Sequence, residues 1–307
     1  MIRSFLPTDL LAILLQDGSL SDMARTWDGM CRTRSRLLTL SGLLVLSLNP
    51  RDRRRTWVWA NGFGFRGLAS VRKRCMDTSW EIDHLILREQ DTACCSSLLE
   101  RLSLTGGEND VNRIFLRLPS DSCLIAAADE AGFSCYMREY LCWLQNNRQP
   151  ASAPAANSDS IPFPRRKRPV DDYRVFELYE KCLPVSVRRV TGMTFSEWQA
   201  NKERGMKAEW VFDGEEGLAG WLGIRSSGRV GQIEVMADSD ERLRRVVDYG
   251  LMFLGNCQQL FCLASETNSA LVQVLEQRGF SRVGMYAALA KEPMAKQKAL
   301  CLMPASA

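Results

Sequence analysis

Histidine is nearly absent from this sequence, which has a single one, His84, among 307 residues. The 11 cysteines include no Cys-x-x-Cys pair. Structural zinc sites need closely spaced Cys and His ligands, and a Ser-His-Asp triad needs a well-placed histidine, so the sequence disfavours both kinds of chemistry. We expect no metal site, and we interpret the cysteines as reduced thiols, most of them buried.

Long hydrophobic runs and a strong net charge are also lacking. The longest apolar stretch, residues 37–48, is too short to cross a bilayer, and the N-terminus has no signal-peptide core. Lys and Arg outnumber Asp and Glu by only 40 to 36. Arginine clusters occur, but no recognisable nucleic-acid-binding module accompanies them. We therefore expect a cytoplasmic protein that binds neither membranes nor nucleic acid.

Residues 149–169 are rich in Pro, Ala and Ser and have no apolar periodicity. A segment of this composition buries too little apolar surface to repay its ordering, so we predict a linker. It separates an N-terminal domain, 1–148, from a C-terminal domain, 170–307, each long enough to bury a core. We interpret the basic run 165–168 as the solvated end of the linker; the alternative is a docking site for an acidic partner.

Both domains end in the same order of elements, strand, helix, strand, helix, strand. In the first, the last four are a helix over 92–104, a strand over 112–119, a helix that stops at Gly132, and a strand over 134–144. The second repeats the order, with its last helix, 268–280, stopped at Gly279. This pattern predicts an internal repeat and an α/β fold with a mixed sheet.

The closing helix resembles a motif of the GNAT (Gcn5-related N-acetyltransferase) superfamily. Four positions match in each domain: Asn268, Glu276, Gly279 and Phe280 in the second, and Asp121, Glu130, Gly132 and Phe133 in the first. The likeness covers nearly all of both domains, so the chain is similar to a tandem GNAT protein. The resemblance implies two GNAT-like acyl-CoA N-acyltransferase domains, acetyl-CoA or another acyl-CoA as co-substrate, and a small-molecule or peptide amine as acceptor.

In GNAT folds, acyl-CoA binds beside a splayed strand and the loop after it, whose glycines let the backbone approach the pyrophosphate. In the first domain, Ala93 and Cys95 stand at the two glycine positions. The candidate cofactor-binding residues are Leu87, Arg88, Gln90, Thr92, Ala93, Cys94, Cys95 and Ser96. In the second domain the helix start has no glycine, and Asp238 and Glu241 have the spacing of a capping box. We interpret that start as a structural cap.

On the closing helix, many GNAT enzymes carry a tyrosine that acts as general acid. At that position this sequence has Ala128 in the first domain and Leu275 in the second, and neither side chain can donate a proton. Strand alternation predicts that Glu81 and Asp83 lie on one face with Leu85 and Leu87, beside the acyl-CoA. We take Glu81 and Asp83 as candidate general bases, with pairing to the arginines of residues 72–74 as the competing interpretation.

Other reactive side chains have plainer interpretations. We expect His84 on the opposite strand face as a packed histidine, and Cys94 and Cys95 as small packing residues rather than reactive thiols. Glu234 occupies the equivalent strand of the second domain. The expected function is an acyl-CoA-dependent N-acyltransferase with degenerate cofactor loops. The alternative is a non-catalytic GNAT-fold module for ligand sensing or protein interaction, because a fold alone does not establish function.

Overall fold

The computed structural model describes residues 1–14, 20–29, 55–61, 64–88, 91–145, 164–203 and 208–294. Residues 37–48, most of the expected linker (149–163) and Gln90 lie outside these ranges. The described part consists of two similar halves. We call residues up to 145 the first half and residues from 164 the second half.

The first half begins with short elements and continues with a hairpin and two strand–helix units. In chain order it contains β1 (Ile2–Ser4), α1 (Asp9–Leu14), β2 (Leu20–Asp22), β3 (Arg55–Asn61), β4 (Gly64–Lys73), β5 (Ser79–Arg88), α3 (Thr92–Glu108), β6 (Arg113–Pro119), α4 (Leu124–Glu130) and β7 (Ser134–Gln145).

The second half follows the same plan with a longer helical opening. It contains β8 (Arg165–Arg166), the 3-10 turn η2 (Pro169–Asp171), α5 (Asp172–Cys182), α6 (Val185–Thr191), α7 (Phe195–Asn201), β9 (Ala208–Gly214), β10 (Gly217–Ser227), β11 (Val230–Ala237), α8 (Asp240–Phe253), β12 (Gln259–Ser265), α9 (Ser269–Gln277) and β13 (Ser281–Lys291). The predicted capping box of α7 is confirmed, with Thr194 and Glu197 binding each other's backbone N–H.

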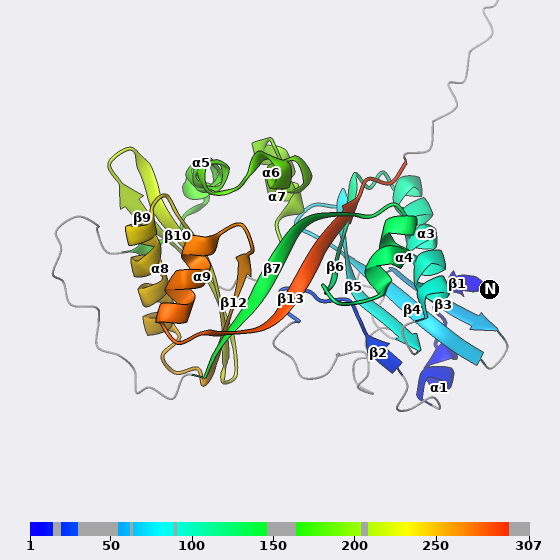
Figure 1. Ribbon diagram of the computed structural model, residues 1–307. Coiled ribbons are helices and arrows are strands. Elements are labelled where there is room, and N and C mark those ends of the chain that lie inside the picture. The colour runs from blue at the N-terminus through cyan, green and yellow to red at the C-terminus, as the bar shows by residue number, and fades with distance from the viewer. Residues whose placement is uncertain are drawn as a thin grey trace, which may run out of the picture.

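The described strands form one continuous sheet, because the closing strand of each half pairs with strands of the other half. Its order is β1-β3-β4-β5-β6-β13-β7-β12-β11-β10-β9-β8, with β2 paired separately to β5. Strand β13 of the second half lies between β6 and β7, and β7 of the first half lies between β13 and β12. Figure 1 shows these two long strands crossing from one half to the other. The boundaries at 148 and 170 stay a prediction, but backbone hydrogen bonds join the two halves.

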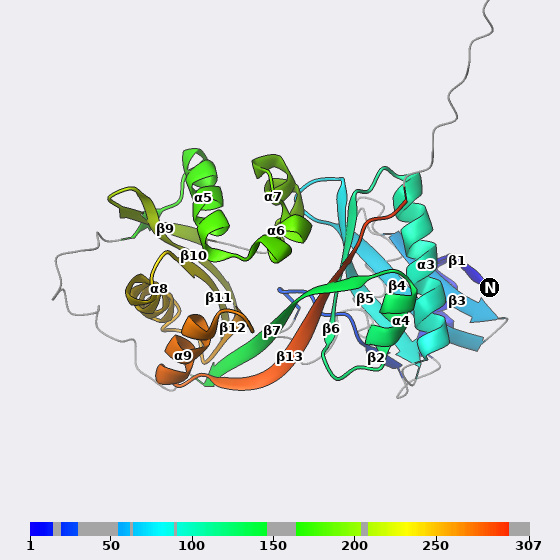
Figure 2. The same cartoon turned by 45° about the horizontal axis from the view of Figure 1, so that its top comes forward.

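Helices cover both faces of the sheet. Helices α3 and α4 pack on one face of the first half, and α8 and α9 pack on one face of the second (Figure 2). Each pair encloses an apolar core. Helix α1 covers the other face of the first half, and α5 covers the other face of the second. The predicted α/β fold with a mixed sheet is confirmed.

Both closing helices end as the sequence predicts. Gly132 and Gly279 have φ of +82° and +90°, a region that glycine adopts at little cost. The N–H of Phe133 donates to the carbonyl of Ala128 at 2.9 Å, and that of Phe280 donates to Leu275 at 3.0 Å. These bonds complete a Schellman motif in each half.

The basic run 165–168 belongs to the folded second half rather than to a solvated linker end. Arg165 donates to both Asp171 and Asp213 at 2.7 Å, and Lys167 lies 2.6 Å from Asp172. Strand β8 pairs with β9. The carboxylates that pair with Arg165 and Lys167 come from the second half itself.

Candidate functional site

Strands β5 and β6 diverge in the first half. They run parallel but pair over three residues, from Ser79 opposite Arg113 to Glu81 opposite Phe115. Strand β5 then continues to Arg88 and β6 to Pro119 without further pairing between them. This is the splay that the resemblance implies.

A β-bulge changes the direction of the side chains on β5. The register with β4 shifts between Ser70 and Val71, so that Ser70 faces His84 while Val71 faces Ile82. Asp83 is the extra residue of the bulge. Ile82 therefore shares a core cluster with Leu85 and Leu87, although their numbers differ in parity. The prediction that Glu81 and Asp83 lie on one face with Leu85 and Leu87 is wrong, because alternation does not survive an inserted residue.

The two candidate bases are buried and already bound. Glu81, 3% exposed, lies 2.6 Å from Arg72 and 3.4 Å from Arg74. Asp83, 5% exposed, accepts a hydrogen bond from the Ser70 hydroxyl at 2.5 Å. The pairing with Arg72 and Arg74 that competed with catalysis for Glu81 is therefore present. A catalytic role for either carboxylate stays a prediction.

His84 is held by a carboxylate from another strand. Its Nδ1 lies 2.6 Å from Asp22 of β2, and Asp22 also accepts the N–H of Leu85 at 3.0 Å. The interpretation of His84 as a packed histidine with a partner is confirmed.

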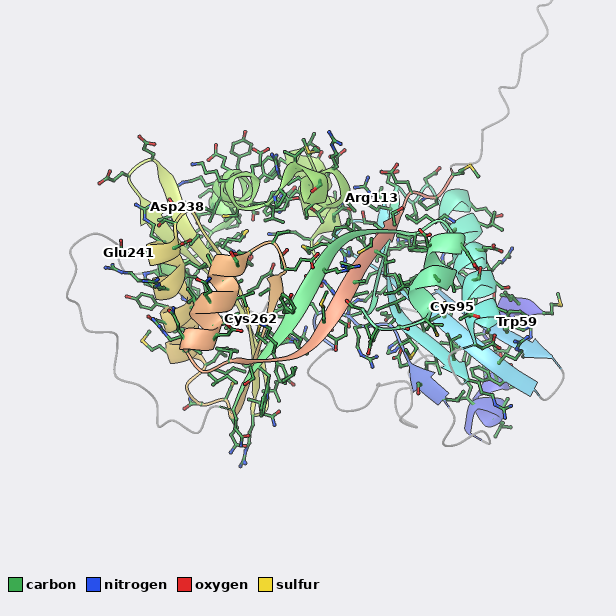
Figure 3. The ribbon with its side chains drawn as sticks, in the orientation of Figure 1. Trp59, Cys95, Arg113, Asp238, Glu241 and Cys262 are labelled. Atoms are coloured by element: carbon green, nitrogen blue, oxygen red, sulfur yellow. The ribbon has the colours of Figure 1, made fainter. Side chains whose placement is uncertain are left out.

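The start of α3 is closed by its own residues. Asp91 caps the helix by accepting the N–H of Cys94 at 3.0 Å, and Arg66 binds the same carboxylate. Cys94 and Cys95 are fully buried, and burial raises the pKa of each thiol to about 12. Cys95, labelled in Figure 3, belongs to the apolar core cluster of the first half. Neither thiol has the lowered pKa of a reactive cysteine.

The remaining cofactor candidates of the first half are divided between surface and interior. Thr92, Ala93 and Arg88 are exposed, Ser96 is half-buried, and Leu87 is fully buried. Strand β2 pairs with this end of β5, placing Leu20 opposite Arg88 and Ser21 opposite Leu87. The edge of β5 that the resemblance assigns to acyl-CoA thus carries a strand of the chain itself. Gln90 lies outside the described residues.

The corresponding strands of the second half also diverge. Strand β11 pairs with β12 from Val230 to Ile233, then continues to Ala237. Within the described ranges, no strand pairs with that side of β11 beyond Ile233. The two halves therefore differ at the same place in the fold.

Glu234 lies directly after this divergence. It stands in a cross-strand row with Gly223 of β10 and Glu209 of β9. Its side chain reaches solvent, yet the surrounding protein removes enough water to raise the pKa of Glu234 to about 8. The carboxylates of Glu203, Glu209 and Glu139 raise this pKa further, and Lys202 opposes them. A carboxyl group with this pKa is mostly protonated at pH 7 and accepts a proton only in its ionised fraction, which grows as the pH approaches 8.

The start of α8 differs from the predicted capping box. The N-cap is Ser239, whose hydroxyl accepts the N–H of Arg242 at 3.5 Å, and not Asp238. Asp238 instead binds the Arg242 side chain, and Glu241 lies 3.8 Å from Arg245. Both acidic residues lie at one end of α8 (Figure 3). The local arginines therefore compensate the charges of Asp238 and Glu241.

The two residues at the position of the family's tyrosine lie in the interior. Ala128 and Leu275 are both fully buried in the apolar cores of their halves. A tyrosine at either position would have to displace core side chains.

A buried ion-pair network between the halves was missed by the sequence analysis. Arg117 of β6 lies 2.7 Å from Glu139 of β7 and 2.7 Å from Glu203, which follows α7. Burial alone would raise the pKa of Glu203, but Arg117 and Arg74 outweigh it and lower the pKa to about 2. Arg117 and Arg74 also line a small crevice with Glu81, Phe115 and Tyr136. No local motif marks these residues, because their partners are distant in sequence.

Comparisons with known proteins agree with this architecture. No protein-family model and no curated protein matches the sequence. Among solved structures, a GCN5-related N-acetyltransferase from Sphaerobacter thermophilus has a TM-score of 0.56 at 14% identity, covering 95% of each chain. A tandem GNAT protein from the clavulanic acid biosynthesis pathway has a TM-score of 0.52 at 14% identity, covering 95% of this chain and 98% of its own. A putative acetyltransferase from Pyrococcus horikoshii has a TM-score of 0.51 at 12% identity, covering 96% and 91%.

At these identities the likeness establishes the fold. The chain has the tandem GNAT fold, as predicted. Of the helices in the described ranges, none is long and apolar enough to cross a bilayer. The described Cys, His, Asp and Glu side chains form no group of three or more that could hold a metal ion.

Proposed function

We propose that this chain is an acyl-CoA-dependent N-acyltransferase whose working site lies in the second half. The observation that carries the proposal is the edge of β11 beyond Ile233, which no described strand pairs, with Glu234 beside it. A free strand edge can supply backbone hydrogen bonds to an extended ligand. The GNAT fold of the solved structures supports this choice of chemistry.

Glu234 is the proposed general base. It would accept the proton that the acceptor amine loses as its nitrogen attacks the thioester carbon. A C–N bond forms, the C–S bond breaks, and the thiolate leaves to take a proton from solvent. The pKa of about 8 allows Glu234 both to accept a proton and to release it near neutral pH.

The surroundings of Glu234 fit an amine. Glu203 and Glu209 contribute negative charge near it, and Lys202 is the nearby cation. A protonated amine would be attracted to such a region before it loses its proton. The acceptor class is therefore a primary amine, carried by a small molecule or by a peptide.

The start of α8 would lie next to the pyrophosphate. Arg242 and Arg245 offer positive charge there, while Asp240 and Glu241 oppose it. Backbone N–H groups at the helix start favour an anion. At the start of α3, Asp91 accepts a helix N–H and pairs with Arg66; at the start of α8, Ser239 is the cap, so a pyrophosphate there would replace Asp238 as the partner of Arg242.

A non-catalytic module is the second candidate. Both halves lack the glycine loop and carry a buried, inert residue at the register of the family's tyrosine. In that case the fold would serve ligand sensing or protein interaction.

Calorimetry with acetyl-CoA tests the proposal on paired variants at the two helix starts. Arg242→Glu should weaken binding at least ~10-fold, because it adds an anion and leaves Asp238 unpaired. The matched variant Ala93→Glu at the start of α3 should leave the affinity unchanged. The opposite result would move the site to Arg88–Ser96 of the first half.

Thiol release from acetyl-CoA with a panel of amines tests the chemistry. Glu234→Gln should lower the rate by about 10²-fold or more and retain acetyl-CoA binding, because only the proton acceptor is lost. Absence of both binding and thiol release in the unaltered protein would favour the non-catalytic candidate.

A further inference from the structure

Residues 20–25 fill the gap between the diverging strands of the first half. Strand β2 pairs antiparallel with the end of β5, from Leu20 opposite Arg88 to Asp22 opposite Ile86. The N–H of Met23 then donates to the carbonyl of Leu85 at 2.8 Å. Two residues later, the N–H of Arg25 donates to the carbonyl of Arg117 on β6 at 2.9 Å. The segment is therefore hydrogen-bonded to both sides of the splay.

The side chains of the segment are packed into the first half. Asp22 binds His84 and the N–H of Leu85, as described above. Met23 and Ala24, 8% and 4% exposed, belong to the same core cluster as Leu85 and Leu87. Displacing the segment would expose these apolar side chains and leave buried polar groups without partners.

The following residues anchor the segment in the second half. The carbonyl of Trp27, a residue 6% exposed, accepts a hydrogen bond from Gln232 of β11 at 2.7 Å. Asp28 lies 2.8 Å from Arg72 of β4 and 3.5 Å from Arg225 of β10. Both ends of residues 20–29 are thus fixed, one in each half.

We propose that residues 20–25 are an internal strand ligand that closes the first half to acyl-CoA, so that the chain takes one acyl-CoA rather than two. A strand edge pairs with one extended partner at a time, and β5 already has one where the ligand would bind. The closed first half then acts as a support, holding Trp27 and Asp28 against β10 and β11. The count of one acyl-CoA rests on the proposed function; the closure of the first half does not.

Amide hydrogen exchange of the full chain tests the closure without any ligand. The N–H groups of Met23, Arg25 and Leu85 should exchange as slowly as those paired between β4 and β5. Met23→Pro, which removes the donor to Leu85, should speed exchange over residues 20–25 and 85–88 at least ~10-fold. Met23→Leu keeps that donor and should exchange like the unaltered protein. Fast exchange over residues 20–25 in the unaltered protein would overturn the proposal.

Saturating acetyl-CoA provides the second arm. We expect one molecule per chain by calorimetry, new protection over residues 234–242, and none over 85–96. Two molecules per chain, or protection over 85–96 with release of 20–25, would contradict the closure. Slow exchange over 20–25 with no acetyl-CoA bound would uphold the closed first half and reject the acyltransferase proposal.

Discussion

The two halves share one fold but differ where their central parallel strands diverge. In the first half, residues 20–25 bridge β5 and β6; in the second, the described strands leave the edge of β11 unpaired beyond Ile233. The helix after the splay also differs: Asp91 caps α3 and pairs with Arg66, whereas Ser239 caps α8, which begins with Asp240 and Glu241 followed by Arg242. Duplication of a fold therefore does not duplicate its site, because a short segment elsewhere in the chain can occupy one copy.

The largest expected effect comes from removing Arg117, which holds the filled splay to the second half. Arg117→Met would leave the buried carboxylate of Glu139 without this cation, and the half-buried carboxylate of Glu203 with only Arg74, at 3.5 Å. Breaking a buried pair of this kind typically costs about 3–5 kcal/mol of the free energy of unfolding. Urea denaturation monitored by tryptophan fluorescence measures the loss. Arg282→Met removes an exposed pair with Glu276 and should leave the midpoint unchanged; an equal loss in both variants would contradict the role assigned to Arg117.

A smaller effect on the stability of the fold is expected from pH. The titration of Asp28 and that of Glu234 should change this stability in opposite directions. Burial would raise the pKa of Asp28, but Arg72 and Arg225 outweigh it and lower this pKa to about 2. The stability contributed by Asp28 is therefore present above its ordinary pKa of 3.8 and lost as the pH falls through about 2. Partial desolvation by the surrounding protein and the neighbouring carboxylates raise the pKa of Glu234 to about 8, so its folded form favours the proton, and stability falls as the pH rises from 4.5 to 8.

Melting temperatures between pH 2 and 9 distinguish these two groups. Asp28→Asn should reduce the dependence at the acidic end, and Glu234→Gln should remove the loss between pH 4.5 and 8 while leaving the acidic end unchanged. A Glu234→Gln profile that parallels the unaltered protein across that window would show that Glu234 titrates as an ordinary surface carboxylate. The two splays would then not differ in the pH dependence proposed for Glu234.

The smallest effect tests whether the closing helices of the two halves end in equivalent ways. Gly132→Ala and Gly279→Ala place a side chain at positive φ, which costs about 1–2 kcal/mol. The cost should be slightly larger at Gly132, where the new Cβ would lie 3.3 Å from Cε of Lys291, than at Gly279, whose nearest neighbour is Leu144 at 3.5 Å. Denaturant titration of both variants checks the order. A negligible cost at either site would show that the helix stops are not equivalent.

Features set by neighbouring residues were predictable from the sequence. The glycine stops, the capping box at Thr194 and the repeated strand–helix order depend on spacing within one element, and the structure confirms them. The bulge at Asp83 was not predictable, because counting by two along a strand cannot detect an inserted residue. It reversed the expected faces of Glu81 and Asp83.

Features set by distant contacts were also missed. Strand β2 has three residues, too few for a periodic signal, and Trp27 meets Gln232 across 205 positions of the chain. Arg117 and Glu203 likewise come from different halves. Their importance follows from burial and pairing in the folded state, which composition and spacing do not encode.

The exchange of β7 and β13 sets an order for folding during synthesis. When the first half leaves the ribosome, β6 lacks the neighbour that β13 will supply, and β7 lacks neighbours on both sides. Unpaired strand edges of this kind are open to pairing with other chains. Strand β13, which comes last among the described strands, therefore completes the sheet, and a chain halted before residue 281 leaves one edge of β6 and one edge of β7 unpaired.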